Sequence, residues 1–318
     1  MVRRHELTDA QWRRIESLLP VNGRPGGQWA DHRRVINGVL FRARTGVPWP
    51  DPPERCGPWQ TVYKRHRRWS ADGTWRRILG EPQIEADAAD PDGTPAQTER
   101  EESRRRGREW AVNIDSTSCR AHQHGAGARR RATSHKRGRD AREETDGREA
   151  LGRSRGGLTT RTHLLSDDRA RPLAWQTSPG QRGDSPMFVT VLESLRIRRH
   201  GSGRPRSRPG RVRGDKAYSS RDNRAYLQRR GIKATIAQPD DRRANRRRKG
   251  RAGGRPPAFD KTQYRRRSAV ERCVSKWKQY RAVASRYDKR DYIFNGTLAV
   301  TAIAIWLRDT VQEPSETT

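Results

Sequence analysis

The sequence has few cysteines and few large apolar residues. Three scattered cysteines in 318 residues make neither a disulfide framework nor a zinc spacing, which fits a reducing cytoplasm. Leu, Ile, Val and Phe together supply 45 residues, about 14%, which excludes one large apolar core. No apolar run approaches the roughly 18 residues that span a bilayer, and no secretory signal is evident. We therefore expect small ordered cores in a cytoplasmic protein with no membrane partner.

The charge is strongly one-sided. Lys and Arg number 70 against 37 Asp and Glu, a formal net charge of +33, and Arg accounts for 61 of the cations. GC-rich codons explain a preference for Arg, but they do not explain the uncompensated excess. Arg is the residue best suited to bidentate phosphate contacts. The composition predicts a nucleic-acid partner.

Residues 1–84 are predicted to form a small all-α domain. Thr8 and Gln11 form a capping box, and further helices are expected from Asp31 to Gly46 and from Pro58 onward. The third helix would turn Trp59, Val62, His66 and Trp69 inward and its cations outward, which is typical of a helix-turn-helix-like DNA-binding domain. A solvated face on a helical bundle is the alternative. The cations expected on the outer side are Lys64, Arg65, Arg67 and Arg68.

A charged linker is expected over residues 85–109, followed by an α/β domain over 110–318. The expected order is three strands, a helix, a strand, a helix, a strand and a helix, which matches a ribonuclease H-like mixed sheet. The last strand and helix of this order are expected over 233–237 and from Tyr264 to Tyr280, and a final apolar helix over 293–307 follows them. Basic loops are expected near 128–142 and 242–254, where they would contact phosphates without sequence preference.

Three acids stand out by position. Asp115 is expected to end the first strand, Asp215 to end a later strand, and Glu271 to lie within a long helix. Carboxylates gathered at neighbouring strands and an adjacent helix can hold hard divalent cations such as Mg²⁺. A pair of such ions activates the attacking oxygen and stabilises the leaving oxygen in phosphoryl transfer. Taken singly, each acid is better explained as a surface ion pair in an Arg-rich chain.

The neighbours of Glu271 support the functional interpretation. Tyr264, Arg267, Glu271 and Lys278 fall on one helical face, while Val270, Cys273, Val274 and Trp277 fall on a face that would pack on the sheet. Arg267 would orient the Glu271 carboxylate or hold a phosphate, and Lys278 would reach a phosphate further along. An exposed structural face is the alternative.

This spacing resembles the signature around the catalytic glutamate of bacterial insertion-sequence transposases of the DDE type. Further motifs resemble the insertion-sequence-5 group, in the order in which that group carries them and over most of the chain. They are Gly46-Val47-Pro48-Trp49, Gly57-Pro58-Trp59-Gln60-Thr61-Val62-Tyr63, Asp115-Ser116-Thr117, Gly183-Asp184-Ser185-Pro186 and Asp215-Lys216-Ala217-Tyr218.

The resemblance implies a ribonuclease H-like catalytic domain behind a helical DNA-binding domain. Asp115, Asp215 and Glu271 would be catalytic and would bind two Mg²⁺ ions, for which Mn²⁺ can substitute. Lys216 would join Tyr264, Arg267 and Lys278 in contacting double-stranded DNA, both element ends and target. The protein would cleave and transfer DNA strands as a homo-oligomer on DNA, in association with the bacterial nucleoid.

Three other functions remain open at this stage. A catalytically inactive or domesticated DNA-binding protein would keep the helical domain without the chemistry, and a metal-dependent nuclease would hydrolyse without joining strands. An RNA-binding structural protein would make the spacing of the acids accidental. Cys119, His122 and His124 crowd together like zinc ligands, but no second Cys or His pair follows at zinc spacing, so DNA-facing or sheet-capping roles are preferred for the histidines.

Overall fold

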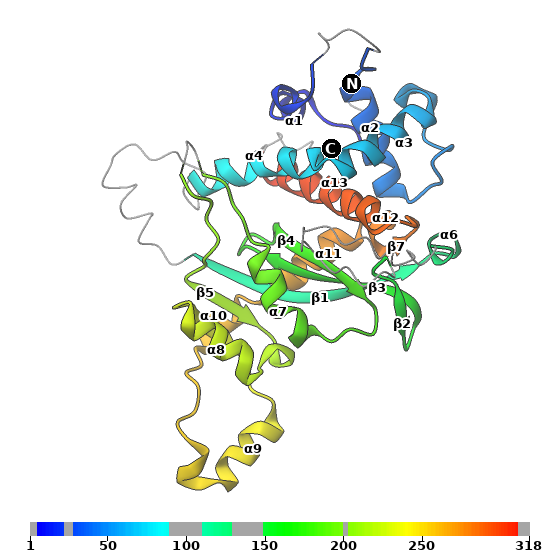
Figure 1. Cartoon of the computed structure of the whole chain (residues 1–318). Helices are drawn as coiled ribbons and strands as arrows, with labels where there is room; N and C mark the ends of the chain where they lie inside the picture. Colours follow the sequence, from blue (N-terminus) through cyan, green and yellow to red (C-terminus); the bar gives the residue numbers. More distant parts are fainter. Residues whose placement is uncertain (1–4, 22–27, 89–109, 129–148, 200–202, 311–318) are drawn as a thin grey trace, which may run out of the picture.

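The computed structural model describes residues 5–21, 28–88, 110–128, 149–199 and 203–310. A group of helices covers one edge of a mixed sheet, further helices flank both faces of that sheet, and a basic arm extends away from the far edge (Figure 1). Within the described ranges, no helix is long and apolar enough to cross a membrane.

The helical group contains α1 (Asp9–Arg13), α2 (His32–Thr45), α3 (Trp59–Ala71) and α4 (Thr74–Ala88). The predicted capping box is confirmed, since Gln11 N donates to Thr8 Oγ1 and Thr8 N donates to Gln11 Oε1. Gly46 ends α2 at φ 71°, and a Cβ there would lie 2.8 Å from the Cβ of Arg281. Glycine is therefore required both by the left-handed backbone and by the close approach of a distant segment.

The sheet is built around β1 (Ala111–Ala121). β3 (Gly157–Ser166) pairs antiparallel on one side of β1, and β5 (Arg211–Gly214) pairs parallel on the other. β4 (Pro172–Pro179) is antiparallel to β3, and β6 (Lys233–Ile236) is parallel to β5. The short strands β2 (Gly152–Ser154) and β7 (Ser285–Arg286) add to β3 and β1. The sheet is the mixed, ribonuclease H-like arrangement predicted from the order of elements.

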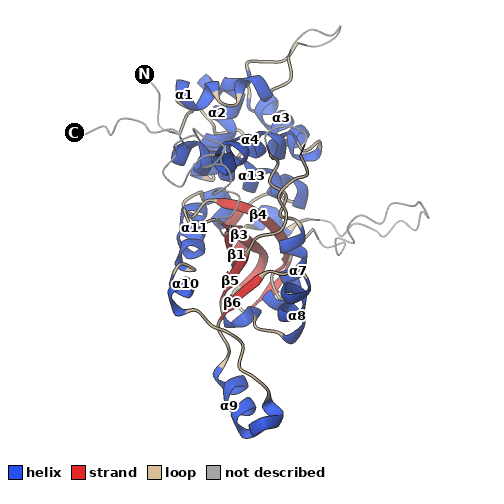
Figure 2. Ribbon diagram, turned by 90° about the vertical axis from the view of Figure 1, so that its left-hand side faces the viewer, coloured by secondary structure: helices blue, strands red, loops and turns tan. Residues whose placement is uncertain are grey.

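Helices cover the two faces of this sheet. α7 (Asp184–Glu193) and α8 (Arg221–Arg229) lie on one face, and α10 (Lys261–Arg265) and α11 (Ser268–Lys278) lie on the other (Figure 2). α11 packs on β1 and β3. It buries Val270, Cys273 and Trp277 as the sequence predicted, because these residues recur on one helical face.

The long helix α13 (Asp291–Thr310) joins the helical group to the sheet. It packs against α2, α3 and α4 and also against β4 and α11. Two short helices lie near it, α6 (Gln123–Ala126) after β1 and α12 (Arg281–Ala284) before β7. One contiguous apolar cluster runs from Leu7 in the first segment to Leu307 in the last helix. The N-terminal helices therefore share their core with the C-terminal helix.

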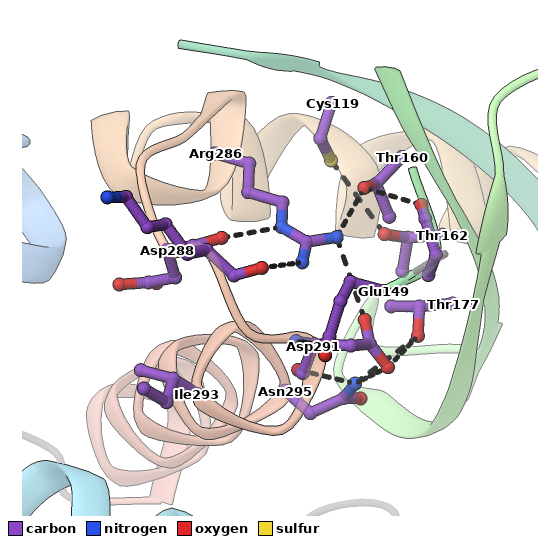
Figure 3. Close-up of polar contacts among 12 residues, drawn as sticks. Cys119, Glu149, Thr160, Thr162, Thr177, Arg286, Asp288, Asp291, Ile293 and Asn295 are labelled. Carbon is purple, nitrogen blue, oxygen red and sulfur yellow. Dashed lines mark hydrogen bonds and ion pairs between the residues drawn. The ribbon is translucent and has the colours of Figure 1, made fainter. Parts of the chain in front are cut away.

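A buried polar network anchors the start of α13 to the sheet (Figure 3). The fully buried Arg286 donates to Thr160 Oγ1 at 2.7 Å and to the Asp288 carbonyl at 2.9 Å, and its Nη1 lies 3.7 Å from Asp291 Oδ1. Thr177 Oγ1 and Asn295 Nδ2 both donate to Asp291 Oδ2 at 3.0 Å. Most of these links cross between the sheet and the segment leading into α13, so the network fixes their relative position.

Several predicted boundaries were wrong. Asp115 does not end the first strand, because β1 stays paired with β3 as far as Arg120 opposite Thr159. The predicted basic loop at 242–254 contains α9 (Asp240–Arg248) and a 3-10 turn, η4 (Gly250–Gly253). Acids in the first turn of α9 and arginines in its last turn complement the helix dipole. The predicted loop over 128–142 lies outside the described residues except for Ala128.

Two helix predictions also need correction. α4 continues to Ala88, four residues into the predicted linker, and 89–109 lies outside the described residues. The helix predicted from Tyr264 to Tyr280 is divided into α10 and α11, because Arg267 N and Val270 N bond three residues back rather than four. The N-cap of α7 is Gly183, so the Asp184 side chain can make other contacts.

Candidate active site

Asp115 lies in the middle of the central strand. It stands opposite Leu164 of β3, and its side chain keeps 26% of its surface exposed. Burial raises the pKa of Asp115. The Ser116 backbone N–H at 2.8 Å opposes that rise, the charges of Asp215 and Asp184 add to it, and Arg267 opposes it. A partly buried carboxylate among other carboxylates is a favourable place for a cation.

Asp215 is brought beside Asp115 by strand register. Asn113 pairs with Arg213 in the parallel ladder between β1 and β5, so two residues further along each strand the chain reaches Asp115 and Asp215. Asp215 follows β5 directly and caps the 3-10 helix η3 (Lys216–Tyr218), accepting a hydrogen bond from Ala217 N at 2.8 Å. The adjacent Lys216 is exposed.

Arg267 joins the third predicted acid to the first. Its Nη2 lies 2.6 Å from Glu271 Oε1, and its Nη1 lies 3.9 Å from Asp115 Oδ2. Its guanidinium also lies 5.5 Å from the centre of the Tyr264 ring, within cation–π range. The structure thus brings three of the four residues of the predicted helical face together around one cation, and Lys278 stands exposed on α11.

The donor set matches the chemistry of a hard divalent cation, because each predicted ligand is a carboxylate. Among the described residues, however, no three acids, histidines or cysteines lie close enough together to hold an ion as they stand. The Arg267 guanidinium binds Glu271, whose side chain is 54% exposed. Strand register places Asp115 and Asp215 side by side, while the carboxylate of Glu271 is paired with Arg267.

A fourth acid, Asp184, supports the site from the opposite face of the sheet. Ser116 Oγ donates to Asp184 Oδ1 at 2.6 Å, and Arg161 Nη2 donates to Asp184 Oδ2 at 2.8 Å. The buried Tyr218 lies nearby. Its pKa is raised by burial and by the charges of Asp184, Asp115 and Asp215. Asp184 therefore holds the residue next to Asp115 and adds to the negative field.

The sequence did not indicate that Asp184 belongs to the site. The available signal was its place in Gly183-Asp184-Ser185-Pro186, just where a helix begins after an antiparallel hairpin. Gly183 can serve as the N-cap of the helix. The carboxylate of Asp184 is therefore not needed for capping and can bind another residue. That partner, Ser116, is 68 residues away in the chain and was not predictable from periodicity.

The predicted basic face of α3 is present, with one exception. Lys64, Arg67 and Arg68 are exposed. The prediction that Arg65 faces solvent was wrong: it is 6% exposed, with its guanidinium 4.2 Å from the centre of the Trp29 ring. Burial lowers the pKa of Arg65 to about 10, and the charge of Arg68 adds to that effect. A planar guanidinium stacks on aromatic rings, which is why a cation is accommodated there.

The apolar face of α3 differs in one residue as well. Val62, His66 and Trp69 are buried as predicted, but Trp59 keeps 37% of its surface exposed. It stands at the first turn of the helix, where the neighbouring elements no longer cover it. The histidines after β1 form no metal cluster with Cys119 in the described chain. His122 instead stacks on His124 and on Tyr287, with ring centres 4.6 Å apart in each pair.

Two family models match the chain. Residues 7–79 match "Putative transposase of IS4/5 family", and residues 106–307 match "Transposase DDE domain". The two matches together cover most of the helical group and the part of the chain that contains the sheet, Asp115, Asp215 and Glu271.

Three curated proteins are similar to parts of the chain. The protein y4sN of Sinorhizobium fredii is 36% identical over 126 residues, 39% of this chain and 83% of its own length. A 16.2 kDa protein of insertion element IS402 from Burkholderia cepacia is 35% identical over 79 residues, 23% of this chain and 54% of its own. The "Putative transposase for insertion sequence element IS6501" of Brucella ovis is 28% identical over 152 residues, 48% of this chain and 100% of its own.

Among solved structures, the "Mos1 Strand Transfer Complex" aligns with 91% of this chain and 80% of its own. The TM-score is 0.25 and the sequence identity is 9%.

Proposed function

The chain belongs to the DDE transposases of insertion sequences, and on that premise we propose that it binds the terminal inverted repeats of its own element, cuts the DNA there and joins the freed 3′ hydroxyl to target DNA. Residues 1–84 would bind the element ends, and residues 110–318 would carry the chemistry behind a linker at 85–109. The three carboxylates Asp115, Asp215 and Glu271 form the catalytic site.

The observation that carries this proposal is the convergence of the acids from separate parts of the chain. Strand register sets Asp215 beside Asp115, and Arg267 links Asp115 to Glu271. The like charges raise the pKa of Asp115 in addition to the effect of burial. Such clustering costs stability, and it is expected where the carboxylates have a cation to hold.

Asp115, Asp215 and Glu271 would hold two Mg²⁺ ions, with Mn²⁺ as a substitute. Bound there, the ions would supply Lewis-acid activation of the attacking oxygen and stabilisation of the leaving oxygen. For Glu271 to take part, its carboxylate must exchange Arg267 for the cation. The released guanidinium is then available to a backbone phosphate beside Tyr264, a role to which the fork of Arg is suited.

The remaining cations would position the DNA. Lys216 follows the second acid, and Lys278 lies further along α11, so both reach phosphates close to the site of cleavage. Lys64, Arg67 and Arg68 would contact the duplex from α3. Because two element ends are joined in one reaction, the protein would act as a homo-oligomer on DNA, and its charge would keep it associated with the nucleoid.

The test incubates the purified protein with labelled element ends and Mg²⁺ and resolves the products. Wild type is expected to cleave at the element boundary and to give joined products with target DNA. Asp215→Ala should bind the ends but not cleave them. Glu193→Gln, which removes an exposed acid at the end of α7, is the matched control and should cleave normally.

The outcomes separate the proposal from its rivals. Binding by wild type with no cleavage would mean a DNA-binding protein without catalysis. Cleavage with no joined product would mean a nuclease. Cleavage retained in Asp215→Ala would remove Asp215 from the catalytic site.

A further inference from the structure

A cavity of about 720 Å³ opens at the junction between the helical group and the sheet. Its walls come from the α2–α3 connection, α3, the residues around α6, and the segment leading into α13. These elements meet on one side of the molecule, at the end of β1 away from α10 (Figure 1). This volume is within the range of sites for small organic groups, roughly 300–1,000 Å³, and it is too small for a base-paired duplex.

Seven of the seventeen residues that line the cavity are aromatic or histidine residues. Trp49 lies 5.3 Å from Tyr63 between ring centres, and Tyr287 lies 4.6 Å from His122. Trp59 and Tyr292 stand at its edge, each with 37% of its surface exposed. Aromatic side chains held partly exposed by a rigid scaffold are the usual platform on which nucleobases stack.

The charges of the cavity favour an anionic ligand. Arg67 and Lys289 are exposed, and Arg67 Nε donates to the Tyr292 hydroxyl at 3.2 Å. The acid among the lining residues, Asp288, is buried and paired with Arg42, whose guanidinium lies 4.7 Å from the centre of the Trp49 ring. Aromatic rings inside the cavity and cations at its opening suit a ligand that consists of a nucleobase attached to a phosphate.

The cavity lies well away from the catalytic acids. Asp115 is in the middle of β1, whereas His122 follows the last residue of that strand, Ala121. Six residues of extended strand span about 20 Å, which corresponds to roughly six base pairs along a DNA strand. A nucleotide in the cavity is thus distinct from the one at the scissile phosphate.

We propose that this cavity binds one unpaired nucleotide of the DNA substrate, with the base stacked among Trp49, Trp59 and Tyr287 and its phosphate held by Arg67 and Lys289. The base must leave the duplex to enter, as enzymes that take a base out of the stack require. The proposal rests on the proposed function in that the substrate is DNA, but it does not require cleavage. In this proposal, the junction between the helical group and the sheet holds a segment of the DNA substrate in a distorted conformation.

The experiment measures binding in EDTA, so that cleavage plays no part. The probes are element-end duplexes that are either fully paired or carry one unpaired 2-aminopurine six base pairs from the scissile phosphate. Wild type is expected to bind the unpaired probe about tenfold more tightly and to quench its fluorescence by stacking. Trp59→Leu should abolish both effects without changing affinity for the paired duplex, and Trp59→Tyr should keep them.

A matched pair of variants tests the proposed contact between Arg67 and the phosphate. Arg67→Gln removes a proposed duplex contact as well, so it should weaken binding of the paired probe and weaken binding of the unpaired probe more. Arg68→Gln, one residue further on the same helix and not among the lining residues, should weaken both probes equally. Equal affinity of wild type for the two probes would overturn the proposal, as would a preference kept in Trp59→Leu. So would displacement of the probe by an equal concentration of free deoxyadenosine monophosphate, which would assign the cavity to a small metabolite.

The two proposals fail separately. Asp215→Ala should retain the preference for the unpaired nucleotide while losing cleavage. A wild-type protein that prefers the unpaired probe but never cleaves would contradict the proposed function alone. One that cleaves with no preference would contradict the nucleotide site alone.

Discussion

Arg42 of α2 and Asp288, 246 residues later in the chain, form an ion pair in which each side chain is only 3% exposed. The Arg42 Nη2 to Asp288 Oδ1 distance is 3.3 Å, and Thr297 Oγ1 donates to Asp288 Oδ2 at 2.8 Å. Burial alone would raise the pKa of Asp288, but Arg42, His66 and Thr297 outweigh it, so the pKa is lowered. The pair ties the helical group to the segment that leads into α13.

Removing one partner of this pair should be costly. Asp288→Ala leaves Arg42 buried with its main counter-charge gone, and we expect a loss of about 3–5 kcal/mol in the free energy of unfolding, measured by urea denaturation. The Arg42→Met/Asp288→Leu double variant leaves no uncompensated charge. Its loss in the free energy of unfolding should be smaller than the sum of the losses in Arg42→Met and Asp288→Leu. An Asp288→Ala loss below about 1 kcal/mol would show that the pair is not buried in solution.

The histidine beside this pair predicts a dependence of stability on pH. Burial lowers the pKa of the fully buried His66 to about 4, below its ordinary value of 6.5. Because the unfolded chain takes up this proton first, the free energy of unfolding should fall as the pH drops from 6.5 towards 4 and should be constant above 6.5. Burial lowers the pKa of His163 to about 4 as well, so both histidines contribute.

Urea denaturation across that pH range checks this expectation. His66→Asn should give a shallower decline than wild type, because one proton-linked group is removed, although the variant is less stable throughout. An unchanged slope in His66→Asn would contradict the assignment of the decline to this residue.

The proposed catalytic site should be a source of instability in the absence of metal. The pKa of Asp115 is raised, so the folded protein disfavours its ionised form. Above the pKa values of both states, Asp115→Asn should therefore increase the free energy of unfolding, while cleavage is abolished. Thermal unfolding in EDTA measures the first effect, and the product assay measures the second. A less stable Asp115→Asn variant would contradict the expectation.

Added Mg²⁺ gives an independent readout of the same site. It should raise the melting temperature of wild type and leave that of Asp115→Asn nearly unchanged, because ligand binding stabilises only the state that binds. An equal rise in both proteins would indicate that the ion acts elsewhere.

The arm formed by α9 and η4 predicts a salt effect on DNA binding. No residue of α9 is buried, and the arm extends away from the rest of the protein (Figure 1). Its residues Arg247, Arg248 and Arg251 are exposed. The triple change of these residues to Ala should leave the circular dichroism spectrum and melting temperature nearly unaltered. For every phosphate that the arm no longer neutralises, the slope of log affinity against log salt should become shallower by about 0.9. An unaltered slope would mean that the arm does not bind DNA.

The sequence predicted the elements of regular structure well where one signal was sufficient. The Thr8 capping box, Gly46 at the end of α2 and the apolar face of α11 each follow from local chemistry and appear as expected. It failed where a distant partner decided the outcome. β1 continues past Asp115 because β3 pairs with it, and Arg65 is buried because Trp29 and Trp69 receive its guanidinium.

The candidate site shows the same division. The spacing of Tyr264, Arg267 and Glu271 predicted that these residues lie together. They do so because the three are close in sequence along α10 and α11, so local helix geometry is sufficient. Asp184 was not predicted as part of the site, because its hydrogen bond with Ser116 depends on how α7 lies on the sheet. The aromatic cavity was not predicted either, since its walls come from four separated segments.

The place of α13 in the core bears on the order in which the protein folds during synthesis. α2, α3 and α4 leave the ribosome early, but the helix that completes their packing is made after the whole sheet. N-terminal segments normally fold as units as they emerge. Here a nascent chain cannot complete the packing of the proposed DNA-binding helices until α13 has been translated. A translation product that stops before α13 would lack the packing partner of these helices, and under the proposed function it would make a poor competitor for the element ends.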